Sequence, residues 1–345
     1  MKPITLYILA TLVLAACGRR ECPFSGNGDS RDSLTVTADI LLPTTPVRNQ
    51  GDSELCWIYA MLATIETDRL AEGDSVTLSP LWLARRSLEE QATDRYLSGR
   101  RVSLRGTLPE AMRLLERYGI VAWDAYRPAE PSPSRSAARR AEALSYTFSR
   151  HRKGLEQLRR AMDDALDSTL GPAPRNVFMF GMEYTPQEFA HSLCLPGDWK
   201  AYTSFTHHPF RKPFAVEIPD NRQRHEAMNI PLGELLSMTV KSLRDGHPVA
   251  WEGSMAFLRE GKEAGEFPES NATAALQRQR QRLFESHRLT DDHCMAIIGT
   301  GHDHKGRRYF IMKNSWGKDN GHGGYVYISE RQFALSTIMI MVRKR

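Results

Sequence analysis

The sequence predicts an α+β fold in which a mainly helical half is followed by a half rich in strands. After Cys56, Ser79 and Thr107, apolar residues recur at three- and four-residue spacing, the pattern of helices with one buried face. The apolar runs at residues 248–251 and 293–299 instead indicate buried strands. Because the chain has 345 residues, 41% of them hydrophobic, we expect one large or two interleaved globular domains with a substantial core.

The first residues predict a leader and a lipid anchor. Residues 4–16 are mostly apolar but too few to span a bilayer of about 30 Å, so residues 1–16 are expected to be a signal peptide. Residues 14–17 read LAAC, which resembles the lipobox of bacterial lipoproteins. That resemblance implies that Cys17 is lipidated and that the protein lies in the bacterial cell envelope, anchored to a membrane outside the cytoplasm. Residues 17–40 are then a flexible tether. The alternatives are an ordinary secreted precursor and a retained membrane anchor.

Composition and charge limit the partners of the chain. The net charge of +5 is modest for this length and does not favour a nucleic-acid partner. A basic run between Arg135 and Arg160 is interpreted as a solvated helix face. His207 and His208 are expected in a turn, because no further ligand lies at metal-like spacing. We therefore expect no metal and no other cofactor.

Cys56 is the residue around which the predicted site is built. It lies where a loop turns into a helix, and the free N–H groups and the dipole of a helix N-terminus favour a thiolate over a thiol. Such a position can lower a cysteine pKa from about 8.5 to below about 7. From this stretch alone, a small apolar residue at the head of a core helix is an equal alternative.

A catalytic thiolate needs a partner that holds a proton, and His293 fits this role. His293 opens the apolar run 293–299, and residues 302–307 read as a turn before a second strand at residues 309–313. Asn314 follows that second strand directly. Two adjacent strands would therefore place His293 and Asn314 side by side.

Gln50, Cys56, His293 and Asn314 stand in the order and spacing of papain-like cysteine peptidases, which this chain resembles. In that family a glutamine lies six residues before a Cys-Trp pair, as Gln50 does here. A distant histidine is followed by Asn-Ser-Trp-Gly, which Asn314 opens, and then by a Gly-Tyr pair, here at residues 324–325.

Further motifs resemble the bleomycin hydrolase and aminopeptidase C branch of that family. They are HGGY at residues 322–325 and SLRDG at residues 242–246. The branch typically carries a helical insertion, here at about residues 129–174, where the resemblance is thinnest. The resemblance implies a two-lobed, papain-like domain at residues 41–345, with a helical left lobe, a β-barrel-like right lobe and the active-site cleft between them.

The resemblance also implies a role for each motif residue. Cys56 is expected to be the nucleophile and His293 its proton acceptor. Asn314 would orient the imidazole, and Trp316 would shield that hydrogen bond from water. Gln50 and the backbone N–H of Cys56 would bind the oxyanion.

The walls of the cleft depart from the family pattern. The residues expected to contact substrate are Glu54, Leu55, Arg105, Gly106, Asp292 and Trp316. Relatives usually have two glycines where Arg105 and Gly106 stand, so the long cation of Arg105 could narrow the cleft or favour an acidic substrate group. Glu54 stands where relatives usually have glycine, and its carboxylate could repel acidic substrates or raise the pKa of the thiol.

These observations predict a membrane-tethered cysteine peptidase that cleaves peptide or protein substrates through an acyl-enzyme on Cys56. In the resembling branch a C-terminal tail restricts the cleft to aminopeptidase action. Because the sequence ends at Arg345, directly after the last expected strand, endopeptidase capability is expected. The alternatives are a cleft blocked by Arg105 or by the insertion, a transpeptidase, and a catalytically inactive module that binds peptides or a partner protein. Disulfide pairing of Cys22, Cys194 or Cys294 and the oligomeric state are left open.

Overall fold

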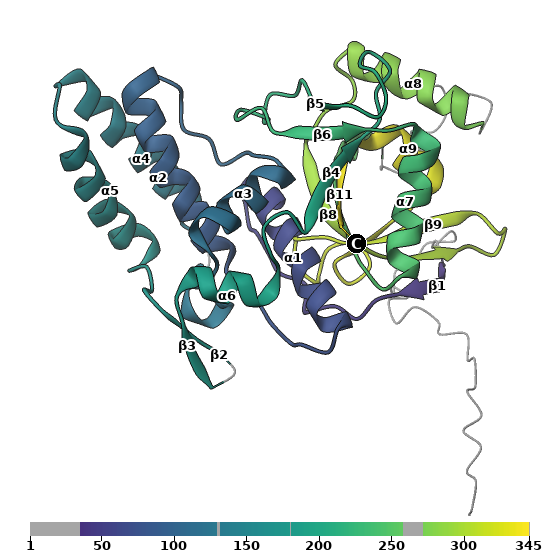
Figure 1. Ribbon diagram of the computed structural model, residues 1–345, viewed down its shortest axis with the longest axis horizontal. Coiled ribbons are helices and arrows are strands. Elements are labelled where there is room, and N and C mark those ends of the chain that lie inside the picture. Colours follow the sequence, from purple (N-terminus) through teal and green to yellow (C-terminus); the bar gives the residue numbers. More distant parts are fainter. Residues whose placement is uncertain (1–34, 130–131, 180, 258–271, 345) are drawn as a thin grey trace, which may run out of the picture.

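The computed structural model describes residues 35–129, 132–179, 181–257 and 272–344, which form two lobes (Figure 1). One lobe is mainly helical and the other is built on a sheet, which confirms the α+β prediction. The predicted signal peptide, Cys17, Cys22 and Arg345 lie outside the described residues. None of the helices in the described ranges combines the length and the apolar character that crossing a membrane requires.

The helical lobe contains the helices that the apolar spacing predicts. Its elements are α1 (Cys56–Ala71), α2 (Pro80–Ser98), α3 (Leu108–Tyr118), a 3-10 helix η1 (Trp123–Ala125), α4 (Ser134–Arg150), α5 (Leu155–Leu170), a hairpin of β2 (Val177–Met179) and β3 (Met182–Tyr184), and α6 (Pro186–Leu193). Ser79 caps α2, because its hydroxyl oxygen accepts a hydrogen bond of 3.2 Å from the backbone N–H of Trp82. α6 was not predicted from the sequence.

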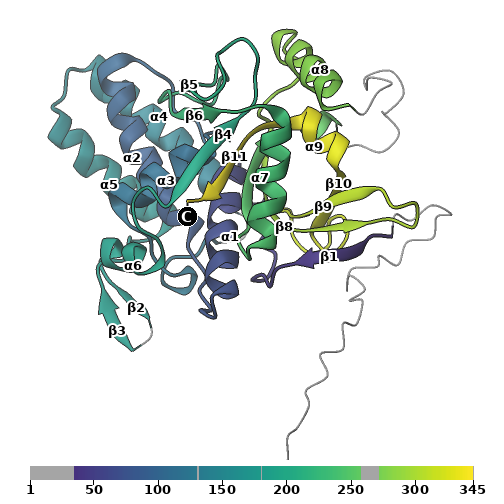
Figure 2. The same ribbon diagram turned by 45° about the vertical axis from the view of Figure 1, so that its right-hand side comes forward.

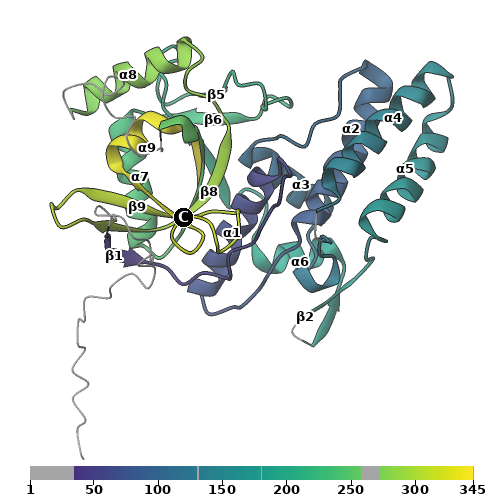
Figure 3. The same ribbon diagram turned by 180° about the vertical axis from the view of Figure 1, so that it is seen from behind.

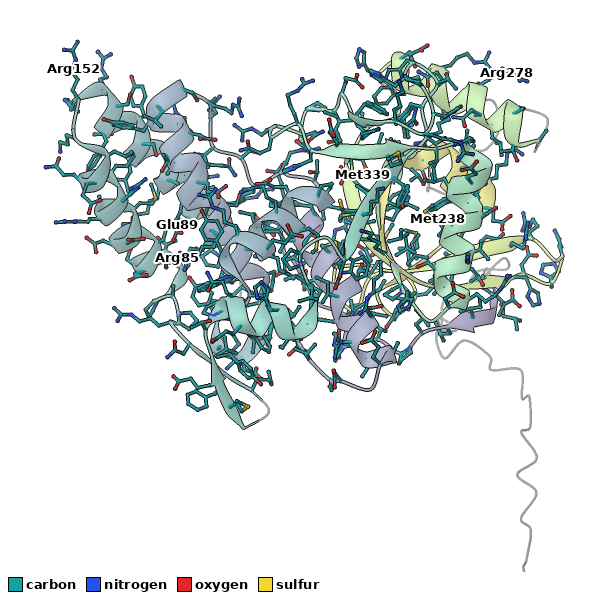
Figure 4. The ribbon with its side chains drawn as sticks, viewed as in Figure 1. Arg85, Glu89, Arg152, Met238, Arg278 and Met339 are labelled. Atoms are coloured by element: carbon teal, nitrogen blue, oxygen red, sulfur yellow. The ribbon has the colours of Figure 1, made fainter. Side chains whose placement is uncertain are left out.

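The insertion forms the outer layer of the helical lobe. α4 and α5 pack on α2, on the side away from the strands (Figure 1). Arg85 of α2 is buried and joins these helices, since it donates hydrogen bonds of 2.9 Å to Glu89 and 2.7 Å to Asp167 of α5. Figure 4 shows Arg85 and Glu89 together on α2. The helices of the insertion therefore do not lie across the face of the sheet.

The second lobe is built on one twisted sheet with the strand order β10, β9, β8, β7, β11, β4, β6, β5, and with β1 paired to β8. Its elements are β1 (Thr37–Leu41), β4 (Trp199–Thr203), β5 (Pro213–Ala215), β6 (Glu226–Asn229), α7 (Leu232–Arg244), β7 (Val249–Gly253), a 3-10 helix η2 (Met255–Phe257), α8 (Thr273–Glu285), β8 (His293–His302), β9 (Arg308–Lys313), β10 (Tyr325–Ser329), α9 (Glu330–Ser336) and β11 (Thr337–Arg343). Figure 2 shows α7 in front of the central strands, with α8 and α9 above it.

Helix α1 joins the two lobes. It packs against β7 and β8 on one side and against α2 and α3 on the other (Figure 3). Trp57, Ile58, Met61 and Leu62 are buried in this position. Because α1 is covered from both sides, these residues are shielded from solvent, whereas Cys56 at the start of the helix is partly exposed.

The predicted tether extended too far. Residues 17–40 were assigned to it, but Thr37–Leu41 form β1, which runs antiparallel to residues 299–302 of β8. The composition that indicates a tether stops at Ser33, and the following residues alternate β-branched and apolar side chains, which suit a strand. The folded domain therefore begins before residue 41.

Candidate active site

Cys56 is the first residue of α1 and is partly exposed at the junction of the lobes. The hydrogen bond that the Cys294 thiol donates, together with the neighbouring His293, lowers the pKa of Cys56 well below its ordinary value, although burial opposes this. As one of the first residues of a helix, Cys56 also has a backbone N–H without a partner inside the helix. The sequence indicated the helix terminus and His293 as causes of a thiolate, but not Cys294.

His293 and Asn314 lie side by side, as the predicted pair of strands requires. β8 and β9 are antiparallel neighbours, and the Nε2 atom of His293 is 2.7 Å from the Oδ1 atom of Asn314. The amide oxygen of Asn314 can only accept, so Nε2 carries a proton and Nδ1 is the atom left for Cys56. The Trp316 ring lies 4.5 Å from the His293 ring and covers this hydrogen bond, while His293 itself is 3% exposed.

Gln50 is fixed beside the nucleophile by two hydrogen bonds. Its amide nitrogen donates to the carbonyl oxygen of Ser53 at 2.6 Å, and its amide oxygen accepts from the hydroxyl of Ser315 at 2.6 Å. An amide nitrogen has two N–H groups, so one remains available. Together with the backbone N–H of Cys56, it can donate to an oxyanion.

Four of the predicted cleft residues take distinct positions. Gly106 is required, because a Cβ atom there would lie 2.8 Å from the ring of Trp57. Leu55 is buried directly before α1, whereas Glu54 is exposed. The backbone of Asp292 adjoins His293, but its carboxylate accepts hydrogen bonds of 2.7 Å from the N–H of Met255 and 2.9 Å from the hydroxyl of Ser254. The Asp292 carboxylate therefore holds the segment after β7, and a contact between Asp292 and substrate stays a prediction.

Arg105 reaches from the helical lobe to the strand lobe. Its guanidinium donates a hydrogen bond of 2.7 Å to the carboxylate of Asp220 and one of 3.1 Å to the backbone oxygen of Asp291. Asp220 belongs to residues 216–225, which leave the sheet between β5 and β6 and contact the helical lobe again where Arg222 donates to Gln91 at 2.9 Å. The sequence led us to expect that Arg105 could narrow the cleft. In the structure its side chain connects the two lobes.

Three acidic residues near Cys56 were not identified as site residues from the sequence. They are Asp220, Glu252 and Asp291. Glu252 of β7 is 1% exposed, and burial raises its pKa well above the ordinary value. Burial, with the nearby charge of Asp220, raises the pKa of Asp291 to about 7. A signal for Glu252 was present, because a single carboxylate stands in the otherwise apolar stretch VAWEG.

The two histidines that were expected in a plain turn have a third group beside them. The Nε2 atoms of His207 and His208 lie 3.1 and 2.6 Å from the carboxylate of Glu217. Gln281 accepts from the N–H of Thr206 at 2.6 Å, so its amide nitrogen donates to Nδ1 of His207 at 2.9 Å. Nε2 of His207 must then carry the proton, and it is not available as a metal ligand in this arrangement.

The free cysteines in the described part of the chain are Cys56, Cys194 and Cys294. Cys194 is buried, and burial raises the pKa of its thiol to about 12. A bridge between Cys194 and Cys22 stays a prediction, because Cys22 lies outside the described residues.

Comparison with known proteins agrees with this geometry. Residues 175–345 match the Peptidase C1-like family. Aminopeptidase E of Lactobacillus helveticus is 23% identical over 383 residues, covering 93% of this chain and 86% of that protein. Aminopeptidase C of Lactococcus lactis subsp. cremoris is 25% identical over 368 residues, covering 90% of this chain and 82% of that protein.

A solved structure shares the fold. The crystal structure of pepw from Lactobacillus rhamnosis HN001 matches with a TM-score of 0.68 at 17% identity, covering 90% of this chain and 82% of that one. The similarity to aminopeptidases C and E agrees with the branch that the sequence motifs resemble. The fold is papain-like, and the chain is a cysteine-type peptidase.

Proposed function

We propose that the chain is a membrane-tethered cysteine peptidase that cleaves peptides through an acyl-enzyme on Cys56. The observation that carries this proposal is the imidazole of His293, held by Asn314 at 2.7 Å beside a cysteine whose pKa is lowered well below its ordinary value by Cys294 and His293. Such a pair holds a thiolate next to a protonated imidazole at neutral pH.

The reaction follows from the position of each group. The Cys56 thiolate attacks the carbonyl carbon of the peptide bond, and the negative charge on the carbonyl oxygen is met by the free N–H of Gln50 and the N–H of Cys56. The protonated His293 then gives its proton to the leaving amine, and a thioester remains on Cys56. His293 next takes a proton from water, which attacks the thioester and releases the acid.

Hydrolysis of a short peptide tests this mechanism. We expect Cys56→Ala to abolish cleavage and Asn314→Ala to reduce kcat, since the imidazole loses its orientation. A reduction of about 100-fold or more is expected for a residue that fixes a catalytic histidine. If Cys56→Ala cleaves at the wild-type rate, the site around Cys56 is not catalytic. A site that binds peptides without cleaving them would then be the better explanation.

Cleavage within peptides is the finer part of the proposal. The described C-terminal residues lie along the sheet, and Arg343 donates a hydrogen bond of 2.6 Å to Asp68, which lies twelve residues along α1 from Cys56. At about 1.5 Å per residue this is about 18 Å from the nucleophile, so these residues do not occupy the cleft. Arg105 does cross between the lobes, and we infer that endopeptidase action requires it to release Asp220.

The membrane tether is supported by the sequence at residues 14–17. We expect wild-type protein to partition into detergent and Cys17→Ser to remain in the aqueous phase, because two or more acyl chains are what stable anchoring requires. Equal partitioning, with an N-terminus that still precedes residue 17, would contradict the lipid anchor. The matched control is Cys194→Ser, which removes a cysteine outside the leader.

A further inference from the structure

The junction beside Cys56 gathers three acidic side chains around one cation, and the side chains of Asp220 and Asp291 also hydrogen-bond to each other. Asp220, Asp291 and Glu252 are close enough to influence one another and the Cys56 thiol. Among the described residues, the cation that acts on Asp220 and Asp291 is Arg105. Its two hydrogen bonds go to the Asp220 carboxylate and to the backbone oxygen of Asp291, so the Asp291 carboxylate is not directly paired with it.

Polar atoms in this junction are buried without a partner. The Oδ2 atom of Asp291, the Oε1 atom of Glu252 and the hydroxyl of Thr107 make no hydrogen bond in the described structure. Asp291 is 8% exposed and Glu252 is 1% exposed, so neither is satisfied by open solvent. A buried acceptor without a partner is costly unless a binding event supplies its donor.

The positions of these atoms place them on the substrate side of the nucleophile. The other oxygen of Glu252 accepts a hydrogen bond of 2.9 Å from the N–H of Leu108, which follows Gly106 and Thr107 on the cleft wall. Asp291 stands two residues before His293. A pocket lined by Trp57, Arg105, Gly106, Glu110, Asp220 and His225 borders the same connection between Arg105 and Asp220.

We propose that Asp220, Asp291 and Glu252 form a subsite for a cationic nitrogen of the substrate, and that the Arg105 guanidinium occupies part of it until substrate binds. This inference rests on the proposed peptidase function. An ammonium group has three N–H donors and suits three acceptors grouped in a buried acidic site, whereas a neutral side chain leaves them unpaired. The cation comes either from the amino terminus of the peptide or from a lysine side chain.

Three peptides with the same scissile bond separate these sources. The first has a free amino terminus and norleucine, the second is acetylated and carries lysine in place of norleucine, and the third is acetylated and carries norleucine. We expect kcat/KM of one of the first two to exceed that of the third by about tenfold or more, because a buried charge pair contributes at least that factor. A preference for the first peptide assigns the subsite to the amino terminus, and a preference for the second assigns it to the side chain.

Variants connect the preference to the proposed residues. Glu252→Gln keeps an oxygen for the N–H of Leu108. We expect this variant to bring the ratio of kcat/KM for the cationic peptide to kcat/KM for the neutral peptide close to one. Asp291→Asn is the second variant, in case the first does not fold. Asp68→Asn is the matched control, because Asp68 is also a buried acid at the lobe junction but lies at the other end of α1, and it should leave the ratio unchanged.

Equal kcat/KM for all three peptides in the wild type would overturn the subsite, as would a ratio that Glu252→Gln and Asp291→Asn both leave intact. The proposed function is tested separately by the neutral peptide. If its cleavage depends on Cys56 while the ratio stays at one, the peptidase assignment stands and the subsite is wrong. If no cleavage depends on Cys56, both are wrong.

Discussion

The thiolate at Cys56 depends on a second sulfur. Because the helix terminus and His293 also stabilise the charge, the sequence alone led to the correct direction for the pKa of Cys56, but the largest cause is the hydrogen bond from Cys294. The nearness of Cys294 to Cys56 could not be foreseen, since it arises from the packing of α1 against β8 across more than two hundred residues of chain.

Removal of this donor should be visible in the reactivity of Cys56. Without the Cys294 thiol, the pKa of Cys56 rises toward its ordinary value, so Cys294→Ala should react more slowly with iodoacetamide at pH about 6 than wild type, by several-fold, and recover at about pH 9. The measurement is the labelling rate of Cys56 against pH by mass spectrometry. Cys194→Ala is the control with an unchanged profile. Identical profiles for Cys294→Ala and wild type would contradict this role.

Asp291 makes stability depend on pH. Its pKa is raised from 3.8 to about 7, chiefly by burial, so between these values the folded protein holds a proton that the unfolded chain has lost. Its contribution to the free energy of unfolding is therefore present below about pH 4 and is lost as the pH rises through about 7, by on the order of 4 kcal/mol. Urea unfolding at several pH values should show that the free energy of unfolding of Asp291→Asn increases relative to that of the wild type between about pH 4 and about pH 7. If the free energies of unfolding of the two proteins change in parallel with pH, Asp291 is not the cause of this pH dependence.

At the scale of elements, a buried polar network fixes α1 to the strand that carries Asn314. Lys313 of β9 donates hydrogen bonds of 2.7 and 2.8 Å to the backbone oxygen and the hydroxyl of Thr45. That hydroxyl donates to Glu66 of α1, which also accepts from the N–H of Leu78 at 2.7 Å. This chain of bonds sets the depth of α1 relative to β9, and hence the position of Cys56 relative to His293 and its amide partner.

Loss of the cation in this network should destabilise the protein. Lys313→Met removes the nearby cation that acts most strongly on the buried Glu66 carboxylate and takes the donor from Thr45, and leaving a buried charge less compensated in this way costs about 3 to 5 kcal/mol. We expect the free energy of unfolding in urea to fall by an amount in this range. Lys200→Met, on the exposed face of β4, is the matched control and should change stability by less than about 0.5 kcal/mol. A small effect at Lys313 would mean that Glu66 is satisfied without it.

The elements that the sequence predicted best are those with apolar spacing. α1, α2, α3, β8 and β9 all begin within one residue of the positions that the sequence indicates. α8 was not expected, because its central residues alternate Gln and Arg, and its buried face includes Arg280. The guanidinium of Arg280 donates a hydrogen bond of 2.8 Å to the backbone oxygen of Ser204 and packs over the ring of Phe205. The spacing of apolar residues cannot indicate a buried face that contains an arginine.

At the scale of the whole molecule, the two lobes and the residues of the motif were predictable, but the connection between the lobes was not. The ion pair between Arg105 and Asp220 joins residues 115 positions apart, and residues 216–225 carry no motif. The sequence did single out Arg105 as a departure from the family pattern. Its partners depend on how the segment between β5 and β6 crosses back to the helical lobe.

The contact between the lobes should control the length of peptide that enters. With Arg105→Ala the connection to Asp220 and Asp291 is lost, so we expect cleavage of a peptide acetylated at its amino terminus to increase, by about tenfold, relative to the wild type. Arg101→Ala is the matched control, because Arg101 lies in the same segment with its side chain 87% exposed. No increase for Arg105→Ala would show that the connection does not limit access.

The most direct test of the account is to trap the acyl-enzyme. Wild-type protein mixed with an activated peptide ester and quenched in acid should carry one acyl group, and peptide mapping should place it on Cys56. His293→Ala should show much slower acylation at neutral pH, because one of the groups that stabilise the thiolate is lost. An acyl group on another residue, or equal acylation of Cys56 with and without His293, would contradict the assignment of Cys56 and His293 as the catalytic pair.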